Sequence, residues 1–179
     1  YVEAAMNSSN VKAIVLRVDS PGGDALASDL IAEVLRKGKG KKPIIVSQGY
    51  VAASGGYWLS MFADTIVAAP NTITGSIGVI GSFMFNKSLK QDLGLSVDHV
   101  QKGKFADLGF GATLPLIGIS LPDRDFTDEE LKMAETGIKT LYKGFVEKVA
   151  LGRKKSFDDI EKIAQGRVWS GSDGLKNGL

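Results

Sequence analysis

The chain of 179 residues has no cysteine and only one histidine, His99. Without cysteine it can form no disulfide, no thiolate zinc site and no cysteine nucleophile, although this absence does not identify its compartment. An excess of one charge is also missing, because the net charge is +2 and the basic residues are dispersed. We therefore have no electrostatic reason to expect a nucleic-acid partner. We also expect neither a cofactor nor a metal.

Long hydrophobic runs are absent as well. Three glycines and a proline interrupt the longest apolar stretch, residues 108–121, so no segment approaches the ~20 residues that a membrane-spanning helix needs. The chain starts at Tyr1 rather than methionine and stops abruptly after Leu179. We therefore expect a soluble fragment of a longer protein, and its length and 44% hydrophobic content predict a single domain over residues 1–179.

The first half of the chain alternates between strand-like and helix-like patterns. β-Branched and apolar runs predict strands, and apolar residues at helical spacing predict helices. The expected strands are 11–18, 43–47 and 65–68, and the expected helices are 26–35 and 54–63. This alternation indicates an α/β fold, with a mainly parallel sheet that helices cover.

The second half is less regular. Small residues predict a turn region over 71–81, and the expected elements after it are a strand at 83–85, a helix at 87–93 and a strand at 97–101. Thr127 and Glu130 form a capping box, which predicts a long helix from there to about residue 151. A helix from 156 that ends before Gly166 and a short strand at 168–169 complete the prediction.

Ser54 is the first candidate for chemistry, because it lies among small residues between an expected strand and an expected helix. A serine nucleophile needs a base and amide donors for the oxyanion. Gly55 and Gly56 would let a substrate approach the backbone closely. The alternative is that Ser54 only caps the helix that follows it.

A second glycine pair, Gly22 and Gly23, follows the first expected strand. Ligands of open α/β sheets bind at the carboxyl ends of the strands, and glycine amides there can face an anion. On its own this segment would be an ordinary turn. Together with Ser54 at the end of the next strand, it predicts an oxyanion hole formed by Gly23 (or Gly22) and Gly55.

The general base is not evident from the sequence. A Ser-His-Asp triad would have to use His99, but a single histidine on a strand-like segment is more often a surface residue. A lysine base would need burial to lower its pKa. Lys102 and Lys104 are candidates by position only.

Four motifs in order along the chain resemble those of a known protease family. They are Val18 to Gly23, Val51 to Tyr57, Thr74 to Val79, and Gly166 to Trp169 followed by Gly171 and Gly178-Leu179. In this combination the chain resembles the signal peptide peptidase A family (peptidase family S49), which are serine/lysine-dyad proteases with a Clp protease/crotonase-like fold.

The resemblance implies roles for particular residues. Ser54 matches the nucleophile, Gly23 and Gly55 match the oxyanion-hole glycines, and Ser76 matches a serine that hydrogen-bonds the lysine base. It also implies signal peptides or other apolar peptides as substrates, a homo-oligomer, and a membrane-associated protein with its catalytic domain on the extracytoplasmic side of a bacterial envelope.

The chain departs from the short form of that family at the base. When Gly103 is aligned with the family's glycine, Ala106 occupies the lysine position and Lys104 lies two residues earlier. The segment Gly103 to Leu108 instead resembles the second half of the long, two-repeat form, in which the lysine comes from the first half. We therefore expect the base to be supplied from outside this chain, by the missing half or a neighbouring subunit.

Three alternatives remain open at this stage. The first is a short-form enzyme in which alanine replaces the lysine at Ala106. The second is a non-catalytic member of the fold that acts as an interaction module. The third is a crotonase-type acyl-thioester enzyme, which would share the fold and the glycine loops but would not need Ser54.

Overall fold

The computed structural model describes residues 1–94, 96, 98–114 and 119–179. They form two compact units, of which the first is Tyr1–Val79 with Thr140–Leu179 and the second is Ile80–Lys139. The expectation of one domain over residues 1–179 stays a prediction.

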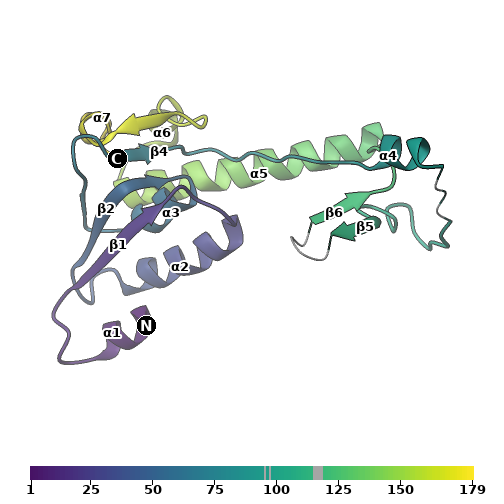
Figure 1. Ribbon diagram of the computed structural model, residues 1–179. Helices are drawn as coiled ribbons and strands as arrows, with labels where there is room; N and C mark the ends of the chain where they lie inside the picture. The colour runs from purple at the N-terminus through teal and green to yellow at the C-terminus, as the bar shows by residue number, and fades with distance from the viewer. Residues whose placement is uncertain (95, 97, 115–118) are drawn as a thin grey trace. The chain divides into compact units, whose positions relative to one another are not determined.

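The first unit contains a five-stranded sheet with the order β1-β2-β4-β7, in which β3 also pairs with β2 (Figure 1). β2 is parallel to β1, β3 and β4, whereas β7 is antiparallel to β4. The α/β prediction with a mainly parallel sheet is therefore confirmed. The strands are β1 (Ile14–Ser20), β2 (Ile44–Ala53), β3 (Thr65–Val67), β4 (Ile73–Gly75) and β7 (Val168–Ser170).

Helix α3 lies at the centre of the larger core of this unit. Its Trp58 ring stacks on Phe145 with a centroid separation of 4.1 Å, and Tyr57, Met61 and Phe62 are fully or almost fully buried beside them. The helices of this unit are α1 (Val2–Asn7), α2 (Ala25–Gly38), α3 (Gly55–Ser60), α6 (Phe157–Glu161), α7 (Gly171–Asn177) and the C-terminal part of α5 (Asp128–Arg153).

The second unit contains α4 (Lys87–Asp92), the start of α5, and an antiparallel pair formed by β5 (Gly111–Leu114) and β6 (Ile119–Pro122). The expected helix at 87–93 and the capping box are confirmed. The Glu130 carboxylate accepts the Thr127 backbone N–H at 2.8 Å, and the Thr127 hydroxyl accepts the Glu130 N–H at 3.3 Å.

Two expected strands of the second unit do not form. Residues 83–85 and 98–101 have no regular structure, and residue 97 lies outside the described residues. Phe83 and Phe85 do alternate with Met84 as in a strand, since both rings contact Phe126 edge-on at 4.7 and 5.2 Å. A strand also requires a hydrogen-bonded neighbour, and that segment has none in the described structure.

Two expectations in the first unit also need correction. The expected buried strand at 11–18 is the edge strand β1, and its Val15 side chain is 66% exposed. On α2, Ala32 and Leu35 are buried whereas Leu26 and Leu30 are largely exposed. Helical spacing identifies an apolar stripe, but the packing decides which part of it is covered.

The described residues include no helix that is both long and apolar enough to cross a membrane. The longest helix, α5, has 26 residues but carries charged side chains along its length.

Candidate active site

Ser54 occupies the sharp junction between β2 and α3. Strand β2 continues to Ala53, six residues beyond its predicted end, and α3 begins at Gly55. The Ser54 N–H completes the sheet by donating to the Gly75 carbonyl at 2.9 Å, and the Ser54 carbonyl starts the helix by accepting the Trp58 N–H at 2.9 Å. Its two backbone groups are thus used by different elements.

The backbone of Ser54 is strained. Its φ is 53° and its ψ is −119°, a conformation that non-glycine residues rarely adopt. Ser54 lies at the N-cap position of α3, yet its side chain makes no capping hydrogen bond. In contrast, Ser156 and Ser170 cap α6 and α7 by accepting backbone N–H groups at 3.1 Å. The structure therefore excludes the capping role that was the alternative interpretation of Ser54.

The Gly22-Gly23 loop meets this junction, as the sequence predicts. A β-carbon on Gly22 would lie 2.8 Å from the Ser54 Cβ and 2.9 Å from the Gly55 nitrogen, and Gly22 has a φ of +115°. A β-carbon on Gly55 would lie 3.2 Å from the Gly23 nitrogen. Only glycine allows two backbone segments to approach this closely.

The structure distinguishes between the two possible donors in this loop. The Gly22 N–H donates to the Ser20 hydroxyl at 3.2 Å, so it is already used. The N–H groups of Gly23 and Gly55 donate to no other group within the described part of the chain, and Gly55 is the first residue of a helix, where amides have no intrahelical acceptor. This geometry favours Gly23 over Gly22 as the partner of Gly55.

Ser20 has a part in this arrangement that the sequence analysis missed. Its hydroxyl holds the Gly22 amide, and its carbonyl would lie 2.4 Å from a β-carbon on Gly56. Serine side chains commonly bond the backbone two residues ahead. The Ser-Pro-Gly sequence at residues 20–22 could have indicated this contact.

Ser76 follows the residue that receives the Ser54 amide. It has a φ of 49°, and its N–H donates to the Arg167 carbonyl at 2.7 Å. Gly75 and Gly78 lie tightly against the segment that leads into β7, because β-carbons there would come within 2.8 Å of Trp169 and 2.7 Å of Gly166. Ser76 therefore belongs to the same unit as Ser54 and directly follows β4, next to the residues that precede β7.

The candidate bases of the sequence analysis lie in the second unit. His99 is exposed, and its Nε2 lies 3.2 Å from the Gln101 amide oxygen. Lys104 forms an ion pair with Glu129, and its side chain is 68% exposed. Ala106 lies in a turn, with its N–H directed to the Gly103 carbonyl at 3.4 Å. Lys104 is therefore an exposed, ion-paired side chain and not a buried one.

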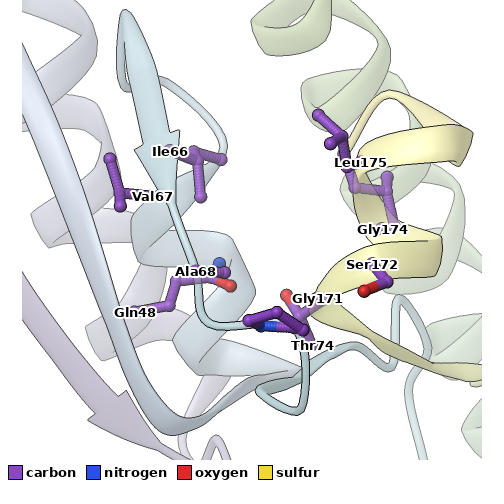
Figure 2. A pocket seen from close by; sticks show the side chains of 11 residues that line it. Gln48, Ile66, Val67, Ala68, Thr74, Gly171, Ser172, Gly174 and Leu175 are labelled. Carbon is purple, nitrogen blue, oxygen red and sulfur yellow. The ribbon is translucent and has the colours of Figure 1, made fainter.

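A separate cavity of about 290 Å³ lies between β3, β4 and α7 (Figure 2). Ile66 and Val67 line one side, Gly174 and Leu175 line the other, and neither Ser54 nor its glycines line it. Gln48 also lines it, and the buried Gln48 Nε2 has no hydrogen-bond partner in the described structure. The cavity is therefore distinct from the serine site.

No group of three or more histidine or acidic side chains within residues 1–94, 96, 98–114 and 119–179 could hold a metal ion. The first unit therefore presents the hydroxyl of Ser54, whose backbone is strained, beside the amides of Gly23 and Gly55, which donate to no other group in the described structure. Strained strand-to-helix turns of this kind present the nucleophile in α/β hydrolytic enzymes.

Comparison with solved structures identifies the fold. A mutant of ClpP1 from Listeria monocytogenes is similar with a TM-score of 0.59 and 15% sequence identity, over 99% of this chain and 80% of that chain. The chain therefore has the Clp protease fold, as the resemblance implied.

Sequence comparison then identifies the family. The family model for peptidase family S49 matches residues 36–179, and the chain belongs to that family. The chain is 38% identical to Serine protease SPPA, chloroplastic, of Arabidopsis thaliana and 42% identical to Protease 4 of Salmonella typhi. These similarities cover 99% and 94% of this chain but 25% and 26% of the relatives, so the chain spans about a quarter of their length.

Proposed function

We propose that this chain carries the nucleophile of a serine peptidase that cleaves peptide bonds through an acyl-enzyme. A neutral lysine amine accepts the Ser54 hydroxyl proton while Oγ attacks the peptide carbonyl. The amides of Gly23 and Gly55 donate to the resulting oxyanion, and the lysine returns the proton to the leaving amine. Water then hydrolyses the ester and regenerates Ser54.

The observation that carries this proposal is the conformation of Ser54. Strain of this kind costs on the order of 1–3 kcal/mol and persists where the surrounding structure enforces it, often at functional sites. Here the strained conformation gives no stabilising capping bond, because the Ser54 side chain caps no helix. It does place a serine hydroxyl beside the Gly22-Gly23 loop, next to the free amides of Gly23 and Gly55.

We propose that the lysine base comes from outside this chain, from a second copy of the fold or a neighbouring subunit. The occurrence of alanine at Ala106 and the exposed ion pair of Lys104 with Glu129 support this proposal. Ser76 would orient that lysine by hydrogen bonding. Its position next to Gly75, the acceptor of the Ser54 amide, is consistent with this role.

The substrates that we propose are apolar peptides, including cleaved signal peptides. We also propose that the protein that contains this chain is a membrane-associated homo-oligomer of a bacterial envelope. These proposals rest on the family resemblance. An extended peptide would add main-chain hydrogen bonds to the site and place alternate side chains in pockets.

A fluorophosphonate probe and a fluorogenic peptide test the proposal on the full-length protein that contains this chain. We expect Ser54→Ala to abolish both labelling and hydrolysis, whereas Ser172→Ala, on α7, leaves both unchanged. Labelling that survives Ser54→Ala would refute the nucleophile assignment. Lys104→Met should retain hydrolysis, and loss of activity in that variant would identify Lys104 as the base.

One alternative function has an observation in its favour. Alanine at position 106 is also what a non-catalytic member of the fold would carry. In that case the unmodified full-length protein would neither react with the fluorophosphonate nor cleave peptides, although its Gly22-Gly23 loop and Ser54 keep their arrangement.

A further inference from the structure

The alignment of Gly22 with Ser54 depends on a break in the pairing of β1 with β2. Before the break Val18 pairs with Gln48, and after it Ser20 pairs with Ala52. Strand β2 therefore has two more residues than β1 across this interval. Irregularities of this type re-aim side chains and are common beside active sites, but they are rare in parallel pairs.

The position of the serine follows from this break. If the earlier register continued, Gly22 would lie opposite Ala52. With the later register, Gly22 lies opposite Ser54, and the close approach of these two residues agrees with it. Two residues correspond to about 6.6 Å along a strand, which is far more than catalytic geometry tolerates.

Asp19 is the residue of β1 at the break. Its carboxylate oxygen Oδ1 accepts the Val51 N–H at 3.1 Å. At this position a side chain of β1, and not its backbone, is therefore the acceptor. A β-carbon on Gly49 would lie 2.4–2.7 Å from the three terminal atoms of Asp19. The carboxylate thus occupies the space that a side chain at position 49 would need.

The irregular part of β2, between Gln48 and Ala52, also forms a hydrogen bond on the side away from β1. The Thr72 hydroxyl, which is buried, donates to the Gly49 carbonyl at 2.8 Å. Asp19 from β1 and Thr72 from the loop before β4 therefore contact the same part of β2 from its two neighbours. The Asp19 contact is the one made by β1, the strand that leads into the Gly22-Gly23 loop.

We propose that Asp19 is a positioning residue for the reaction of Ser54. By bonding the Val51 amide it maintains the register break, and the break sets Ser54 and Gly55 opposite Gly22 and Gly23. Asp19 touches neither the nucleophile nor the oxyanion amides in this scheme. The inference rests on the proposed peptidase function and assigns to it a residue outside the dyad and the oxyanion hole.

Asp64 provides a matched control, because its carboxylate accepts a backbone N–H at the other end of the same strand, that of Ile44 at 2.9 Å. In the full-length protein, Asp19→Ala should lower kcat and the rate of fluorophosphonate labelling at least about tenfold, with KM changed less than about twofold. Asp64→Ala should lose comparable stability with kcat per folded molecule nearly unchanged. Asp19→Asn, whose amide oxygen still accepts the Val51 amide, should restore most of kcat.

A double-mutant cycle tests the same contact from its other side. Gly49→Ala should push the carboxylate away and reproduce the kcat of Asp19→Ala, and combining the two changes should add no further loss. The proposal is overturned if Asp19→Ala keeps kcat within about twofold of the unmodified protein, or if Asp64→Ala lowers kcat as much. Hydrolysis that persists in Ser54→Ala would instead overturn the proposed function itself.

Discussion

Removal of the Ser54 hydroxyl should abolish activity without weakening the fold. The hydroxyl makes no capping bond, so Ser54→Ala should change the free energy of unfolding by less than about 0.5 kcal/mol. Ser54→Gly should stabilise the first unit. Glycine adopts the observed φ of 53° without the strain of about 1–3 kcal/mol, and this gain is offset by about 0.5–1 kcal/mol of added freedom in the unfolded chain. We expect a net gain of about 1 kcal/mol.

A true cap in the same unit supplies the comparison. The Ser156 hydroxyl accepts the Asp159 N–H at 3.1 Å at the start of α6. Ser156→Ala should therefore lower the free energy of unfolding by about 1 kcal/mol. The two serine-to-alanine changes are chemically identical, so they differ only in what the hydroxyl does in the folded state.

Urea denaturation followed by tryptophan fluorescence measures these differences, because Trp58 and Trp169 both belong to the first unit. The m-value should stay constant across the variants, so that midpoint shifts report stability. If Ser54→Ala lost about as much as Ser156→Ala, Ser54 would be a helix cap after all. If Ser54→Gly were destabilising, the argument from strain would fail.

Three further predictions concern other parts of the chain. Gly22→Ala should abolish hydrolysis and lower stability, because its β-carbon would lie 2.8 Å from the Ser54 Cβ and 2.9 Å from the Gly55 nitrogen, at a φ of +115°. Peptide hydrolysis and thermal unfolding measure the two effects. Hydrogen bonds from Arg124 lower the pKa of Glu130 from 4.5 to about 2. The Glu130 carboxylate therefore stabilises the folded state fully above pH 4.5, and this contribution is lost as the pH falls toward 2. Denaturation curves across that range should show a smaller pH dependence in Glu130→Gln. Asp29→Ala removes the acceptor of the Trp58 indole N–H at 3.1 Å and should cost about 1–2 kcal/mol in urea, whereas an unchanged midpoint would show that this contact is dispensable.

Local patterns in the sequence were sufficient for most elements and for the candidate nucleophile. The capping box at Thr127 and Glu130 is confirmed because all of its contacts lie within four residues. The turn at Gly22 and Gly23 and the placement of Ser54 between a strand and a helix were likewise evident from neighbouring residues. The strand expected at 83–85 does not form, and local patterns were insufficient there because a strand depends on a pairing partner elsewhere in the chain.

The sequence alone determined the α/β class, the family resemblance and the choice of Ser54, because periodicity and motif order are properties of the chain itself. Only the tertiary structure decided that β1 is an edge strand, that Gly22 lies opposite Ser54, and that the serine is strained and caps nothing. The first depends on the order of the strands, the second on the register between strands about thirty residues apart, and the third on how the end of β2 packs, and no local pattern encodes these.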